Sequence, residues 1–448
     1  MRNDNLKIND ILWNTIGTVT YAAISLLLSL VILNLAGKIE GGIFSFGFST
    51  IARLTYTITF FGIRPLHIVD IKYTYSFNDY IKFGLKMGMI AILLASLFII
   101  YRFIDGSYAI TKTLLLFILI LHGAIDGLAD YYESEYQRVN KLAYSGQSLF
   151  FRISAFTITL IIVLYFTSNL LFAEISALII ELIAFYILNV NRSNKIFKKI
   201  DTSSNSLKTN SLFLVALPLF LINFLDMFIF TLSKFFVDST LGDVASGFFG
   251  LLFMPTNAIY LVMTLFMKPV LTPLSNAYYN DKHEYHKILI NSSIFAVGLA
   301  FASIIAAFIF DNLYLEIIYF LTGNNYSEFN DIATKLFTII VIGGCFYTVS
   351  TPLFFSLIIE NKQRYLLLSY LIVAISSFFV IRYYVLNLNL LGAAIGFAVC
   401  MFLVLVGIFV VKLMTVILKW VMKFIKIMML WYWHISQKTH LSNHLICW

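Results

Sequence analysis

Residues 11–35 read ILWNTIGTVTYAAISLLLSLVILNL, a run of 25 residues without one charged side chain. A helix that crosses the hydrocarbon core of a bilayer needs about 20 mainly apolar residues. The run is therefore long enough to span a membrane as a helix. Residues 1–10 are polar, and no small-residue cleavage site follows the run, so we expect a retained first span rather than a signal peptide.

The same pattern recurs along the whole chain. Of its 448 residues, 60% are hydrophobic and 12% are charged, whereas about a quarter of the residues in a soluble domain are charged. Backbone in lipid must satisfy its own hydrogen bonds, and the alternating segments of an outer-membrane barrel are missing, so helix is the state that fits. We predict an all-α integral membrane protein with about twelve spans. They lie near 11–35, 43–62, 83–101, 109–129, 146–167, 169–190, 211–236, 244–267, 288–310, 332–359, 364–385 and 390–411.

Lysine and arginine are distributed unequally between the loops. The loops that follow even-numbered spans carry most of them, whereas the longest loop of the other set, Asp311 to Asp331, is acidic and has no basic residue. Basic loops face the cytoplasm, so we expect a multi-pass protein of the cytoplasmic membrane with both termini in the cytoplasm. The net charge of +8 follows mostly from this bias, so it does not indicate nucleic-acid binding.

Two loop segments repeat at an offset of six spans. Residues 64–82 read RPLHIVDIKYTYSFNDYIK and residues 268–287 read KPVLTPLSNAYYNDKHEYHK. Each segment begins with a basic residue followed by proline, and near its end has an acidic residue followed by tyrosine. The segments after spans four and ten also correspond, beginning at Glu135 and Glu360. This repeat predicts two six-helix bundles related by a pseudo-twofold axis along the membrane normal, a plan typical of transporters.

We therefore expect an N-terminal bundle over residues 1–200 and a C-terminal bundle over residues 201–411. Residues 412–448 are expected to form a basic, amphipathic cytoplasmic tail. Its lysines recur on one helical face, as expected of a helix that lies against anionic lipid headgroups; they are Lys412, Lys419, Lys423 and Lys426.

Charged residues inside spans are the candidate functional residues, because a charge in the hydrocarbon region is costly. Arg53 and Lys234 are predicted to line a water-filled cavity between the bundles and to contact an anionic substrate. Asp226, Glu181 and Asp126 are predicted either to bind a coupling cation or to pair with neighbouring basic residues. The spacing alone does not choose between ion binding and pairing.

The other polar residues suggest no chemistry. Arg152 stands at the start of a span, and Glu174, near the end of one, is expected to have a structural role. The chain has no phosphate-binding glycine loop and no HExxH motif, and its cysteines and histidines lack metal-ligand spacing. We therefore expect no catalytic residues, no metal and no cofactor.

Several segments resemble the O-antigen and capsular polysaccharide flippases of the multidrug/oligosaccharidyl-lipid/polysaccharide exporter superfamily. Residues 60–83, FFGIRPLHIVDIKYTYSFNDYIKF, are similar to the loop between spans two and three of that family. Residues 230–271 resemble the segment that joins spans seven and eight in that family. The shared features are a lysine, an aspartate and the tripeptide Phe-Met-Pro, which are Lys234, Asp238 and residues 253–255 here. Residues 231–233, Thr-Leu-Ser, differ from the Asn-Ala-Pro that this family has before the lysine.

The resemblance implies a flippase that moves an undecaprenyl-diphosphate-linked oligosaccharide across the cytoplasmic membrane by alternating access. We further expect membrane lipids and the lipid-linked oligosaccharide as partners and H+ or Na+ as the coupling cation held by the carboxylates, with a functional monomer as the default. One alternative is a cation-coupled drug or small-molecule exporter of the same superfamily. The other is a membrane-embedded polysaccharide polymerase or ligase, which is disfavoured because the longest external loop, residues 311–331, is short and acidic and contains no arginine or histidine.

Overall fold

The structure is a computed structural model that describes residues 8–70, 74–197, 206–323 and 326–444. Those residues are mostly helical and contain no strand. The helices are α1 (Ile8–Phe46), η1 (Gly47–Ala52), α2 (Arg53–Phe60), α3 (Arg64–Val69), α4 (Phe77–Ile104), α5 (Ile110–Arg138), α6 (Leu142–Thr167), α7 (Leu170–Phe185), η2 (Tyr186–Asn191), α8 (Arg192–Phe197), α9 (Ser206–Leu252), α10 (Met254–Asn280), α11 (Lys282–Leu321), η3 (Ser327–Phe329), α12 (Asn330–Ile359) and α13 (Gln363–His444).

Ten long helical segments within the described residues are apolar enough to cross a membrane. Ser211–Leu252 turns at a non-helical residue, Gly242, and leads on into α10, which completes the next pass. Two other segments, Ile8–Ile68 and Gln363–Thr415, contain a non-helical residue at which the chain reverses within the segment, Gly37 and Asn389 respectively. The two arms of each segment pack closely. In Ile8–Ile68 the arms are so close at Gly41 that a Cβ atom added to this glycine would lie only 2.6 Å from the Cα of Leu33 in the other arm. Each segment therefore supplies two passes, and the described chain makes the twelve passes that the sequence predicts.

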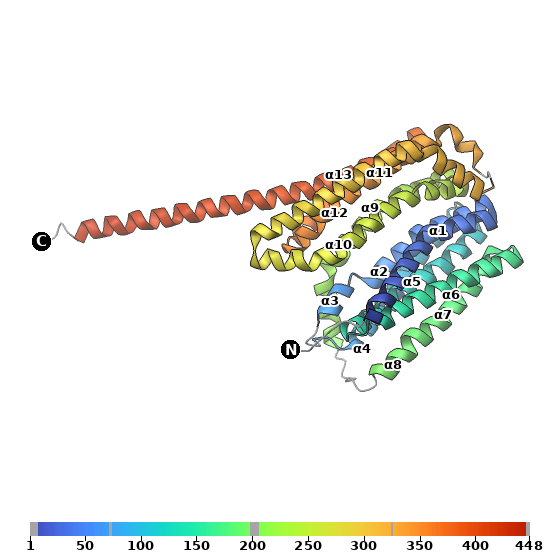
Figure 1. The fold of residues 1–448 in the computed structure, drawn as a ribbon, viewed down its shortest axis with the longest axis horizontal. Coiled ribbons are helices and arrows are strands. Elements are labelled where there is room, and N and C mark those ends of the chain that lie inside the picture. The colour runs from blue at the N-terminus through green and yellow to red at the C-terminus, as the bar shows by residue number, and fades with distance from the viewer. Residues whose placement is uncertain (1–7, 71–73, 198–205, 324–325, 445–448) are drawn as a thin grey trace.

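The helices form two groups, α1–α8 and α9–α13, which lie side by side with α1 packed against α9 (Figure 1). Each group has its own apolar core. Leu116, Phe156 and Ala173 belong to the core of the first group, and Phe337 and Phe397 belong to that of the second. The predicted all-α fold class with two helix bundles is thereby confirmed.

The two groups contain matching turns. Gly37 has φ 80° and ψ 176°, and Gly242, 205 residues later, has φ 84° and ψ −178°. These positive φ values favour glycine. A second glycine follows each turn by five residues, and the two second glycines meet, because a Cβ on Gly247 would lie 2.9 Å from the Cα of Gly42. We call the end of the molecule with Gly37 and Gly242 the glycine-turn end.

The repeated loops are anchored in similar ways at the opposite end. Glu135 lies 2.7 Å from both His67 and Arg138. In the other half, Glu360 accepts a hydrogen bond from Tyr285 at 2.7 Å and pairs with Lys412 at 2.5 Å. A buried acidic residue thus holds the loop segment in each half.

The role predicted for Lys412 is wrong, because its ammonium group pairs with Glu360 instead of facing lipid headgroups. The predicted boundary at residue 412 is not a break in the backbone either, since α13 continues as one helix to His444 and projects from the bundle (Figure 1). The side chains from residue 416 onward, including Lys419, Lys423 and Lys426, lie outside the described residues.

Candidate functional site between the two helix groups

A π-helical segment, η1, places a polar stripe at the boundary between the groups. Ser49 lies within η1, Arg53 follows directly after it, and Tyr56 is one turn further along α2. All three are half-buried. The wider π-helical turn is rare and is often found at functional sites.

Arg53 has no carboxylate partner among the described residues. Its Nη1 atom donates a hydrogen bond to the hydroxyl of Tyr21 at 3.0 Å. Its guanidinium lies 5.7 Å from the ring centroid of Tyr56 and 6.0 Å from that of Tyr21. Tyrosine faces attract the cation but leave its charge without a counter-ion.

Lys234 reaches the same boundary from α9 of the other group. Its side chain is buried, with 4% of the residue surface exposed. The Nζ atom donates to Ser49 Oγ at 3.3 Å and lies 4.6 Å from the ring centroid of Phe253. Within the described chain it too has no carboxylate partner. The positive charges of Arg53 and Lys234 repel each other, so two cations from opposite groups, neither in a direct ion pair within the described residues, face one region.

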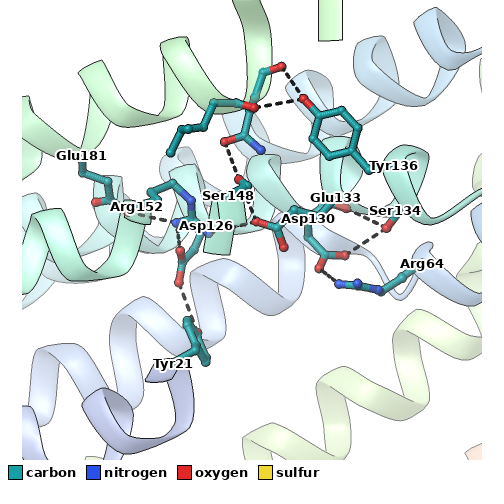
Figure 2. Close-up of polar contacts among 12 residues, drawn as sticks. Tyr21, Arg64, Asp126, Asp130, Glu133, Ser134, Tyr136, Ser148, Arg152 and Glu181 are labelled. Atoms are coloured by element: carbon teal, nitrogen blue, oxygen red, sulfur yellow. Dashed lines mark hydrogen bonds and ion pairs between the residues drawn. The ribbon is translucent and has the colours of Figure 1, made fainter. Parts of the chain in front are cut away.

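Asp126 and Glu181 meet around Arg152, a residue that the sequence placed only at the start of a span (Figure 2). Arg152 pairs with Asp126 and, at 3.1 Å, with Glu181. Glu181 also lies 2.7 Å from His122. The structure thus holds both carboxylates in ion pairs inside the first group.

Tyr21 joins this buried network to Arg53. Its hydroxyl accepts from Arg53 and donates to Asp126 Oδ2 at 3.1 Å. A chain of contacts therefore runs from Arg53 through Tyr21 and Asp126 to Arg152 (Figure 2 shows the last three). Tyr21 was not predicted, because a tyrosine in an apolar span carries no signal that distinguishes it from a core residue.

Asp226 is separate from this network. Its carboxylate accepts hydrogen bonds from Tyr347 on α12 at 2.5 Å and from Tyr370 on α13 at 2.9 Å. The structure shows no hydrogen bond or ion pair between Asp226 and either Arg53 or Lys234 in the described part of the chain. Asp226 is thus a carboxylate held by two phenols with no basic partner there.

Glu174 is fully buried, and neither of its carboxyl oxygens has a hydrogen-bond partner in the described regions. The structural role expected of Glu174 therefore stays a prediction. We have no physical account of this residue beyond its proximity to the acidic Glu40, which acts on it electrostatically.

No protein-family model and no curated protein matches the sequence. Solved structures do resemble it. An inward-facing multidrug-resistance MATE transporter of the MOP superfamily has a TM-score of 0.61 at 12% identity, over 92% of this chain and 99% of the transporter. The lipid II flippase MurJ, inward closed, has a TM-score of 0.62 at 16% identity, over 90% and 87%.

A MATE transporter of Vibrio cholerae gives a TM-score of 0.58 at 12% identity, over 91% of this chain and 95% of that one. These likenesses are below 25% identity and concern the fold. They do not separate O-antigen flippases from other transporters. Together with the long apolar helices, they show that the chain is a multi-pass membrane protein with the fold shared by MATE transporters and the lipid II flippase MurJ.

Proposed function

We propose that this protein is a flippase for an undecaprenyl-diphosphate-linked oligosaccharide, moved across the cytoplasmic membrane by alternating access. The observation that carries the proposal is the pair Arg53 and Lys234, which come from opposite helix groups and have no carboxylate partner within the described residues. In this proposal the basic loops and both termini face the cytoplasm.

A diphosphate suits this pair of cations. Burying a cation without a counter-ion is costly, and a bound anion would remove that cost. The guanidinium of Arg53 can donate two parallel hydrogen bonds to phosphate oxygens, while Lys234 acts as a compact charge. Because one cation belongs to each group, the anion would contact both groups at once and link cargo binding to their relative position. The lipid tail of the cargo can meanwhile stay in the bilayer.

Nearby acidic residues take different roles in the proposal. Asp126 and Glu181 hold Arg152, and Asp126 orients Arg53 through Tyr21, so these carboxylates are positioning residues. Asp226 is the candidate ligand for a coupling cation, H+ or Na+, because its carboxylate has no basic partner in the described chain and has two phenol donors.

A drug or small-molecule exporter is the second candidate, since the fold is equally consistent with it. Many exported drugs are cationic, and such a cargo would be repelled by Arg53 and Lys234. The two cations therefore favour an anionic cargo. A polymerase or ligase has no support from the compared structures, which are transporters.

Reconstituted vesicles test the proposal with a fluorescent undecaprenyl-diphosphate oligosaccharide. We expect Arg53→Ala and Lys234→Ala each to lower the rate of flipping at least about tenfold, because each removes a charge-assisted hydrogen bond. The matched control is Lys86→Ala, which removes an exposed cation from α4. Unchanged flipping in both the Arg53 and the Lys234 variant, or export of a cationic dye with no flipping of the lipid, would contradict the proposal.

A further inference from the structure

A compact ionic cluster joins the two helix groups at the glycine-turn end. Lys112, in the first turn of α5, places its Nζ 2.7 Å from Asp238 Oδ1 and 2.6 Å from Asp243 Oδ1. The hydroxyl of Tyr108 donates to Asp238 Oδ2 at 2.6 Å. Lys112 and Tyr108 belong to the first group, whereas both aspartates belong to α9. Every one of these contacts therefore crosses between the groups.

Two of the three charged residues are buried, and the third, Asp243, has 26% of its side chain exposed. Lys112 exposes 5% of its surface and Asp238 exposes 4%. The ring of Tyr108 covers the ammonium group, with its centroid 4.1 Å from Lys112 Nζ. Removing one member of a buried ion pair is strongly unfavourable, because the remaining charge stays desolvated. This end of the molecule is thus closed by an arrangement that depends on all of its charges.

The backbone supports the same closure. Asp238 and Asp243 stand on either side of the Gly242 turn. A Cβ on Gly42 would lie only 2.1 Å from the carbonyl oxygen of Asp243, so the chains of the two groups touch there. Separating the groups at this end would break the ion pairs and this contact together.

Other contacts between the groups differ in kind. Lys38 and Glu328 also form an ion pair, but at 3.5 Å and with 43% and 52% of their side chains exposed. Such exposed pairs contribute little. Far from the glycine-turn end, Phe61, which follows α2 directly, stacks on Phe220 of α9 with ring centroids 4.0 Å apart. A stacked apolar contact can slide, whereas a buried ion pair is either formed or broken.

We propose that Lys112, Asp238 and Asp243 form a latch that keeps the glycine-turn end closed and that opens when the transporter exposes its cargo on that side. This inference rests on the proposed function to the extent that alternating access requires this end to open. When the end opens, water hydrates the three charges and replaces the ion pairs, so the latch sets the balance between the closed and open states.

Spin-label distances test the latch without any cargo. Labels are placed at Ile104 and Leu313, which are exposed residues of α4 and α11, in a chain whose three cysteines are replaced by alanine. Pulsed electron paramagnetic resonance in lipid nanodiscs then gives the distribution of distances between the groups. We expect Lys112→Gln to raise the ratio of long to short distances at least about tenfold. Tyr108→Phe, which keeps both ion pairs, should give a smaller increase.

The charge-swapped double variant Lys112→Asp with Asp238→Lys should restore part of the short-distance population, since it rebuilds an ion pair between the groups. Lys38→Gln is the matched control and should leave the distribution unchanged. If Lys112→Gln does not yield folded protein, the distance distributions of Tyr108→Phe and of the swapped variant decide whether the latch exists. A Tyr108→Phe distribution identical to that of the unmodified chain, or a swapped variant as open as Lys112→Gln or Tyr108→Phe, would overturn the latch.

These distances are measured without cargo, so they separate the latch from the proposed function. If Lys112→Gln increases the long distances but the unmodified protein does not flip the lipid-linked oligosaccharide, the latch is supported and the proposed cargo is wrong. Normal flipping with an unchanged distance distribution would reject the latch alone.

Discussion

At the scale of single residues, the hydroxyl of Tyr21 decides how firmly Arg53 is held. It accepts from Arg53 at 3.0 Å and donates to Asp126 at 3.1 Å. Tyr21→Phe removes one oxygen and, among the residues that the structure describes, leaves no hydrogen bond to hold the guanidinium of Arg53 in place. We expect about a tenfold lower flipping rate, equivalent to the loss of one or two hydrogen bonds.

Vesicle flipping assays on equal amounts of reconstituted protein measure this effect. Tyr165→Phe is the control, because Tyr165 has 69% of its surface exposed. Since the ring is kept, melting temperature should stay close to that of the unmodified chain. A Tyr21→Phe protein that flips lipid at the normal rate would remove Tyr21 from the positioning role.

The sequence could identify the charged residues but not all of their partners. Arg53 and Lys234 are conspicuous because a charge inside an apolar run is rare. Arg152 lies 26 and 29 residues from its two main partners, Asp126 and Glu181. Several helices could bring such groups together in different ways, so only the packed structure shows that Arg152 takes both carboxylates.

At the scale of helices, the two glycine turns can be tested directly. Gly37 and Gly242 have φ near 80°, and no atom would lie within 4 Å of a Cβ built on either. Their replacement by alanine is therefore opposed by backbone conformation alone. We expect Gly37→Ala and Gly242→Ala each to destabilise the fold by about 1–2 kcal/mol.

Gly298→Ala in α11 is the matched control, since it also has free space around the Cβ but has helical φ. It should be neutral or stabilising, by up to about 1 kcal/mol, because alanine favours helix. Thermal unfolding in detergent compares the three variants. Equal melting temperatures for all of them would mean that the turns do not depend on the left-handed backbone.

Helix positions were largely predictable, because apolar length alone identifies a span. The twelve predicted stretches correspond to the twelve observed passes. Two features were not predictable. The π-helical turn before Arg53 has no compositional signal, and the role of Lys412 depended on Glu360, which stands 52 residues earlier. A lysine stripe has the same spacing whether it faces lipid headgroups or a buried carboxylate.

At the scale of the whole molecule, the repeated loops predicted two related halves, and the matching Gly37 and Gly242 turns extend that repeat to the opposite end. The sequence did not indicate which end is closed. That depends on contacts such as Lys112 with Asp238, residues 126 positions apart on different halves. Neither residue lies in the repeated loops, so the repeat carries no information about their contact.

A reversible cross-link between the halves tests whether they must separate at the glycine-turn end. A Cβ built on Gly250 would lie 3.7 Å from the Cβ of Ser45 in the other half, within the range of a disulfide. In a chain without its native cysteines, we expect Ser45→Cys with Gly250→Cys to stop flipping when oxidised and to recover when reduced.

The matched control places a disulfide inside one half. A Cβ on Gly407 would lie 3.9 Å from that of Ser369, and both residues belong to α13. Ser369→Cys with Gly407→Cys should therefore cross-link without blocking flipping, because no motion between the halves is restrained. If the oxidised Ser45–Gly250 pair still flips lipid at the rate of its reduced form, then the halves do not separate at this end. Cargo would then have to cross without any opening there, and neither alternating access nor the latch would describe this protein.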